Sequence, residues 1–161
     1  GENPVCTTSN MSIRRKTFLR SGGFDVDMVH NEDLEWLIRL VGSGATINGL
    51  AELHVWYRTS PQGLSSDLTA MSQSRQKVLA TARSFGFLPD RRAEAIYLRY
   101  LARRALRLGH YGSSAMYLTV SGLRQSPGAF LFPLRRGLLT ALCAVCAPLL
   151  PKSFRRSLFS R

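Results

Sequence analysis

The sequence predicts an α/β fold class, with short strands and two helices at the N-terminal end and a mainly α-helical, basic region after them. Three short segments, 4–8, 11–13 and 53–58, have the composition of strands. Beyond them the apolar residues recur at helical spacing over longer stretches. The expected parts are an α/β unit at 1–66, a helical region with one helical hairpin at 67–128, and an apolar, basic tail at 129–161.

Two helices are expected in the N-terminal part. The first covers Arg15–Arg20 and stops at Gly22-Gly23, because glycine readily adopts the left-handed conformation that follows many helices. The second starts after Asn31, a favoured N-cap residue, and runs to about Val41. Apolar residues in it recur at i, i+3, i+4 and i+7, which predicts one buried face. These residues are Leu34, Leu37, Ile38 and Val41.

Longer helices are expected in the C-terminal half, from Leu68 to about Phe85, from Arg91 to Leu108, and onward to about Gln125. The helix that starts at Arg91 is the most regular of them. One of its faces is apolar, and an arginine stripe lies opposite that face. The stripe consists of Arg99, Arg103 and Arg107.

Positive charge is concentrated in the C-terminal half. Residues 1–67 carry six Lys and Arg against eight Asp and Glu, whereas residues 68–161 carry sixteen against two. Such asymmetry predicts an anionic partner, and well-solvated arginines without a partner are the alternative. An anionic membrane surface is the preferred partner. Nucleic acid is the less favoured one, because the sequence has no helix-turn-helix, zinc-finger or glycine-rich recognition motif.

The tail holds an apolar stretch at 137–150, fourteen residues interrupted by Pro148 and flanked by basic residues. A helix of that length spans about 21 Å, less than the roughly 30 Å of a hydrocarbon layer. It therefore suits a helix lying in the membrane interface, on a cytoplasmic protein peripheral to the inner face of the cell membrane. A helix packed on the rest of the protein is the alternative. Cys143 and Cys146 form a C-x-x-C without a second ligand pair, which favours small buried residues over a zinc site.

Two carboxylates, Glu32 and Asp33, open the second helix and are the candidate catalytic residues. The helix dipole favours an ionised carboxylate at a helix N-terminus. A base that deprotonates a hydroxyl must be ionised, held by a rigid element and open to a cleft. Ordinary stabilisation of the helix start explains the same two residues without catalysis.

A longer pattern surrounds this pair. In order it contains Asn10, Arg14-Arg15, Gly22-Gly23-Phe24-Asp25, Glu32-Asp33, Trp36 and Arg39. The pattern resembles the acceptor-side half of family 2 glycosyltransferases, whose catalytic domain has the GT-A fold. The resemblance covers about residues 5–65. It implies a partial GT-A-like α/β unit, with Asp33 as general base and Glu32 as its neighbour.

The resemblance also implies an activity, the transfer of a sugar with inversion from a nucleotide-sugar donor to a hydroxyl of a glycan or lipid-linked acceptor. The process would be cell-envelope polysaccharide or glycolipid synthesis. Residues expected to bind acceptor or donor are Trp36, Arg58, Asn10 and His30. Two of them have a second interpretation, since Trp36 also suits a protein core and His30 an exposed loop without a role.

The donor side of that pattern is missing. An Asp-x-Asp that holds a cation beneath the diphosphate is expected in such enzymes, but Asp25-Val26-Asp27 lies in the acceptor-side loop. Mg²⁺ or Mn²⁺ is therefore expected in the complete enzyme, and no metal in this chain, which alone would be inactive. The alternative function is a basic membrane- or nucleic-acid-binding helical module without catalytic activity.

Overall fold

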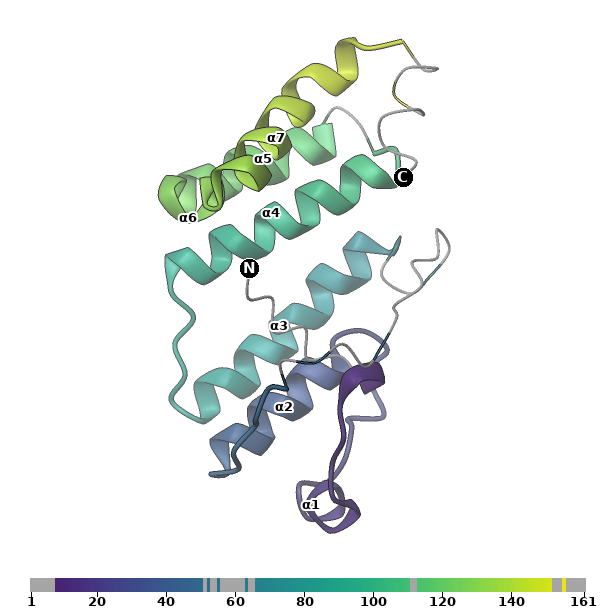
Figure 1. The fold of residues 1–161 in the computed structure, drawn as a ribbon, viewed down its shortest axis with the longest axis vertical. Coiled ribbons are helices and arrows are strands. Elements are labelled where there is room, and N and C mark those ends of the chain that lie inside the picture. The colour runs from purple at the N-terminus through teal and green to yellow at the C-terminus, as the bar shows by residue number, and fades with distance from the viewer. Residues whose placement is uncertain are drawn as a thin grey trace. The chain divides into compact units, whose positions relative to one another are not determined.

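All regular elements in the described part of this computed structural model are helical. The structure describes residues 8–50, 52, 55, 63, 66–110, 113–151 and 155. Two compact units form, Gly1–Leu88 (unit 1) and Pro89–Arg161 (unit 2), and their boundary lies inside the stretch 67–128 expected to be one helical region. In chain order the elements are η1 (Thr8–Asn10), α1 (Arg15–Arg20), α2 (Glu32–Gly42), α3 (Leu68–Ser84), α4 (Arg91–Arg107), α5 (Ser113–Gln125), α6 (Pro127–Leu131), α7 (Leu134–Cys146) and η3 (Ala147–Leu149) (Figure 1).

The predicted α/β fold is wrong, because none of the described residues lies in a strand. Residues 11–13 follow the short turn of η1 as irregular backbone. Most of the other two expected strands, 4–8 and 53–58, falls outside the described residues. A strand exists only where a neighbour completes its ladder of hydrogen bonds, and short apolar runs do not reveal whether such a neighbour is present.

Helix α2 packs against another helix and against aromatic side chains, where an α/β fold would place a sheet. The predicted buried face is wrong in part, because Leu34 and Val41 are 40% and 41% exposed. The helix is rotated so that Glu35 and Trp36 are buried instead. Helices α2 and α3 contact each other and lie side by side in Figure 1. The core of this face is Trp36, Leu37 and Leu40, and Phe18 and Phe24 pack against it. The helical predictions for this part are confirmed, since α1 covers Arg15–Arg20 and α2 runs from Glu32 to Gly42.

The starts of α3 and α4 are stabilised by aspartate caps. Asp67 accepts a hydrogen bond from the backbone N–H of Ala70 at 2.9 Å, and Asp90 accepts one from that of Ala93 at 2.7 Å. Each bond satisfies a backbone donor that has no partner inside the helix. These caps fix where the long helices begin, as the sequence predicted for Leu68 and Arg91.

Unit 2 packs α4, α5, α6 and α7 at close range through small residues. A Cβ added to Gly122 would lie 2.4 Å from the ring of Phe130, a fully buried side chain. A Cβ on Gly137 would lie 2.3 Å from the carbonyl oxygen of Leu131, so the start of α7 touches the backbone of α6. Buried alanines complete these contacts, namely Ala95, Ala102, Ala105, Ala115 and Ala144.

Candidate functional site

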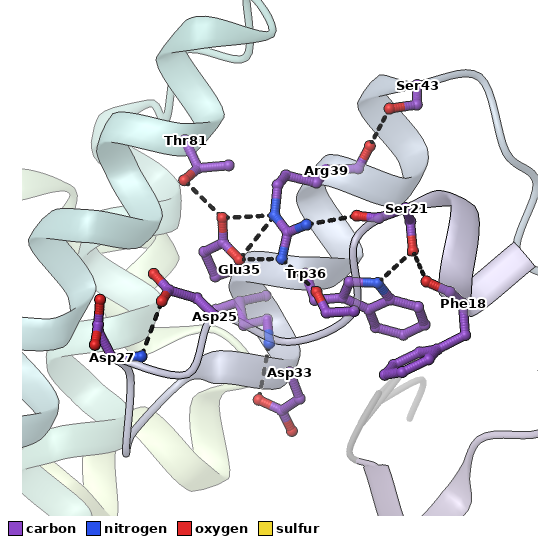
Figure 2. Close-up of polar contacts among 12 residues, drawn as sticks. Phe18, Ser21, Asp25, Asp27, Asp33, Glu35, Trp36, Arg39, Ser43 and Thr81 are labelled. Carbon is purple, nitrogen blue, oxygen red and sulfur yellow. Dashed lines mark hydrogen bonds and ion pairs between the residues drawn. The ribbon is translucent and has the colours of Figure 1, made fainter.

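Arg39 fastens the glycine turn between α1 and α2 to the middle of α2. Its Nη1 donates to the carbonyl of Ser21 at 2.6 Å, and its Nη2 donates to the carbonyl of Gly23 at 2.7 Å. Both Nε and Nη2 also pair with the buried carboxylate of Glu35, at 2.9 Å. Thr81 of α3 donates to the same carboxylate at 2.9 Å, so one cluster ties the turn, α2 and α3 together (Figure 2).

Trp36 lies in the core of unit 1. Its side chain is 1% exposed, and its indole N–H donates to the hydroxyl of Ser21 at 2.7 Å. The rings of Phe18 and Phe24 each lie 5.3 Å from it in tilted or edge-to-face geometry. Such aromatic pairs stabilise a core beyond the burial of their area. The sequence left open whether Trp36 binds substrate or fills the protein core, and its position matches the core.

The start of α2 is anchored to α3 by Asn31. This residue has φ of 57°, a left-handed conformation, and its side chain makes no hydrogen bond that caps α2. Its amide instead donates to the carbonyl of Met71 at 3.2 Å and to the hydroxyl of Ser74. Asparagine tolerates the left-handed region better than most residues, which explains its presence at this bend.

Asp33 and Glu32 are half-exposed on the first turn of the anchored helix. The Asp33 carboxylate accepts a hydrogen bond from the backbone N–H of Leu34 at 2.8 Å. It points away from the cluster of Glu35 and Arg39 (Figure 2). The geometry thus holds Asp33 on a rigid element at the surface of unit 1, which is compatible with both capping and proton transfer.

The remaining predicted site residues are dispersed. His30 is half-buried just before α2, Asn10 is exposed at the end of η1, and Arg58 lies outside the described residues. Asp25 accepts a hydrogen bond from the backbone N–H of Asp27 at 2.9 Å, which organises the acidic loop. Within the described ranges, no three His, Cys, Asp or Glu side chains are grouped so that they could hold a metal ion.

Helix α7 has its small residues inside and its large residues outside. Gly137, Thr140 and Ala144 are buried against the rest of unit 2. The opposite face is a row of aliphatic side chains that are 45–61% exposed. The row consists of Leu134, Leu138, Leu142 and Val145. We call this row the outer face of α7. The sequence predicted an apolar helix here but gave no indication of which side faces outward.

The outer face lies on a short helix. Helix α7 has 13 residues, which correspond to about 20 Å of length. None of the helices in the described ranges combines the length and apolar content that crossing a bilayer requires. Cys143 is half-buried on this helix, where burial raises the pKa of its thiol and neighbouring Cys146 raises it further.

Arg99 of α4 bonds to the backbone of α6 and of the turn that follows it. Arg99 donates from Nη1 to the carbonyls of Ala129 and Phe130, at 3.1 and 2.8 Å, and to that of Phe132. Burial lowers the pKa of Arg99, and the positive charges of Arg103 and Arg136 lower it further. The predicted arginine stripe is therefore packed at one end only. Arg99 bonds to α6 and the turn after it, Arg103 is half-buried, and Arg107 is exposed.

No family model, curated protein or solved structure matches this chain. The resemblance to family 2 glycosyltransferases is therefore corrected, because the described residues are helical where a GT-A fold has a sheet. The Gly-Gly-Phe-Asp and Trp-x-x-Arg parts of the pattern have a structural explanation instead. They build the turn and core in which Gly23, Phe24, Trp36 and Arg39 contact one another.

Proposed function

We propose that this chain binds the surface of anionic membranes through unit 2, with the outer face of α7 lying in the interface. One observation carries the proposal, namely that α7 turns its small residues inward and its leucines outward. A surface helix normally does the reverse, because burying a leucine side chain is favourable by about 1.5–3 kcal/mol. An exposed aliphatic row of this kind marks a contact surface.

Charge supports anionic lipid as the contact. Residues 89–161 carry thirteen Lys and Arg against two Asp and Glu. Arg135 is exposed beside the outer face, on the first turn of α7, and Arg136 is exposed on the side of that turn nearer α4. Aliphatic residues that enter the acyl boundary, together with arginines that pair with headgroups, are the combination that holds a helix in the interface plane. Nucleic acid would use the arginines and leave the leucines without a role.

The same argument gives the location that we propose, the cytoplasmic side of the cell membrane with the protein peripheral to its inner face. Anionic lipids give the cytoplasmic leaflet its negative surface potential. The positive charge of residues 89–161 is complementary to that leaflet.

Vesicle flotation tests this function. The double variant Leu138→Gln/Leu142→Gln removes two residues of the outer face, and Leu50→Gln/Leu88→Gln is the matched control, because Leu50 and Leu88 of unit 1 are 76% and 80% exposed. If each outer leucine contributes about 1 kcal/mol, the first variant should bind vesicles about thirtyfold more weakly. The control should bind like the wild type. Equal losses in both variants, or equal binding to neutral and anionic vesicles, would contradict the proposal.

A second candidate is sugar transfer in the complete protein, with Asp33 as the general base. It is favoured by the position of Asp33 on the first turn of a helix that Asn31 and Arg39 fix in place. Asp33 would take the proton of an acceptor hydroxyl while that oxygen attacks the anomeric carbon of a nucleotide sugar. The nucleoside diphosphate leaves with the bonding electrons, and the configuration inverts.

Donor binding, the glycan or lipid-linked acceptor and a divalent cation belong to this second candidate as well. The described residues offer no group of three metal-ligating side chains, so no step is assigned to a cation here. Asp33→Asn in the complete protein should abolish transfer and leave donor binding unchanged. The control is Asp27→Asn, an exposed aspartate of the preceding loop. Turnover retained in Asp33→Asn would remove Asp33 from the role.

A further inference from the structure

A group of arginines lies where α4 meets α7. Arg103 lies one helical turn beyond Arg99, and Arg107 one turn further. Arg136 comes from the first turn of α7, a helix that contacts α4. The Arg99 guanidinium donates to the carbonyls of Ala129 and Phe130. Within this group, Arg103, Arg107 and Arg136 are therefore the arginines that could bind an anion.

These arginines have no carboxylate beside them within their unit. The only Asp and Glu residues of 89–161 are Asp90 and Glu94, and Glu94 precedes Arg103 by nine residues on α4. Nine residues of α-helix correspond to about 13 Å, beyond the reach of an ion pair. In the described part of the chain, the Arg103 and Arg136 guanidiniums make no hydrogen bond or ion pair.

The arginines also repel one another. Burial lowers the pKa of Arg103, and the charges of Arg107 and Arg136 lower it further. Arg103 is half-buried, whereas Arg107 and Arg136 are exposed. A half-buried charge beside like charges is costly unless a counter-ion neutralises it. A guanidinium pairs with two oxygens of a phosphate at once, so a dianionic phosphate is the counter-ion that such a group fits best.

We infer that Arg103, Arg107 and Arg136 form a binding site for the phosphate monoester headgroup of an anionic lipid. The inference rests on the proposed membrane binding and adds the headgroup class to it. Arg136 is followed one turn later by Leu139, an apolar side chain that is 53% exposed. A lipid whose phosphate meets Arg103 and Arg136 can therefore place its acyl chains along α7.

The test compares two vesicle compositions of equal surface charge, one with phosphatidic acid and one with phosphatidylglycerol. The first lipid has a monoester phosphate and the second a diester. The wild-type chain should bind the phosphatidic acid vesicles about fivefold more tightly. This is the effect expected if one more arginine charge pairs with phosphate at the surface, which is worth about 1 kcal/mol. Arg103→Gln/Arg136→Gln should remove this preference and keep binding to phosphatidylglycerol.

Two further variants separate a site from general charge. Arg91→Gln/Arg92→Gln removes two exposed arginines from the start of α4, so it should weaken binding to both vesicles equally and keep the preference. Arg103→Lys/Arg136→Lys keeps the charge but loses two-oxygen pairing, so the preference should fall. Circular dichroism and thermal unfolding establish that each variant is folded.

The possible results distinguish the headgroup site from membrane binding itself. Binding to both vesicles without a preference overturns the headgroup site and leaves membrane binding standing. A preference that Arg91→Gln/Arg92→Gln also abolishes overturns the site too. No binding to either vesicle, with salt-sensitive binding to RNA or duplex DNA instead, overturns both proposals.

Discussion

Unit 1 and unit 2 are stabilised in different ways. Unit 1 is held by a polar cluster in which Arg39 joins two backbone carbonyls to the buried Glu35 carboxylate. Unit 2 is held by small residues, such as Gly122 and Gly137, that bring helix backbones close together. The two units also differ in charge. Residues 1–88 carry nine Lys and Arg against eight Asp and Glu, whereas residues 89–161 carry thirteen against two.

Under the proposed membrane binding, this difference gives the two units separate roles. In unit 1 the arginine–carboxylate pair is internal, and its function is to fix the turn before α2. In unit 2 the small residues occupy the inside, so the leucines of α7 are left for the surface. Of the basic residues that the structure describes there, most are exposed as well. Unit 2 therefore presents a combined apolar and basic surface, which is the combination that interfacial binding requires.

The strongest test of the comparison removes the polar cluster of unit 1. Arg39→Ala leaves Glu35 as a buried carboxylate without its cation and two carbonyls without their donor. We expect a loss of about 3 kcal/mol in the free energy of unfolding of unit 1. Hydrogen exchange should rise across α2 and stay unchanged in α4 and α5. Arg20→Ala, an exposed arginine of α1, is the control, and an equal effect of both variants would contradict the role of Arg39.

A weaker effect is expected from the close approach in unit 2. Gly137→Ala would place a Cβ 2.3 Å from the Leu131 carbonyl oxygen, so α7 must move away from α6. Overpacking of this kind costs about 1–3 kcal/mol. Gly128→Ala is the matched control, because its Cβ would meet nothing within 4 Å. Thermal unfolding should show destabilisation in the first variant alone, and unchanged stability of Gly137→Ala would contradict the packing described for α7.

The smallest effect concerns the two thiols of α7. Burial and the neighbouring Cys146 raise the pKa of Cys143, so less of its reactive thiolate is present near pH 8. Cys146 is exposed. Iodoacetamide followed by peptide mass mapping should therefore label Cys146 several-fold faster than Cys143, and the difference should shrink as pH rises. Faster labelling of Cys143 would contradict the orientation of the helix.

Several helix positions could be predicted from local signals, because the residues that start or stop these helices are neighbours in the sequence. Leu68 and Arg91 begin helices directly after the capping aspartates Asp67 and Asp90. The strands could not be judged in this way, since pairing depends on residues distant in sequence. Asn31 shows the same limit, because its position was predicted correctly but its side chain bonds to α3 and does not cap α2.

The candidate sites were less predictable than the helices. The spacing of Gly137, Thr140 and Ala144 opposite Leu138 and Leu142 distinguishes two faces of α7, but local sequence favours burial of the leucines. Only the close contact of Gly137 with Leu131 shows why the small residues are inside. Arg39 and Glu35 stand four residues apart on α2, a spacing visible in the sequence, but the bonds of Arg39 to the glycine turn required the three-dimensional fold.

Electron paramagnetic resonance of a label on the outer face of α7 tests the central claim most directly. A spin label at Leu142→Cys, with the native cysteines changed to serine, is compared with a label at Arg124→Cys on the exposed side of α5. On anionic vesicles, the label at 142 should become accessible to oxygen and protected from a polar relaxation agent, while the label at 124 stays exposed to the polar agent. A label at 142 that stays exposed to the polar agent, or that is shielded from both, would contradict membrane binding by this face.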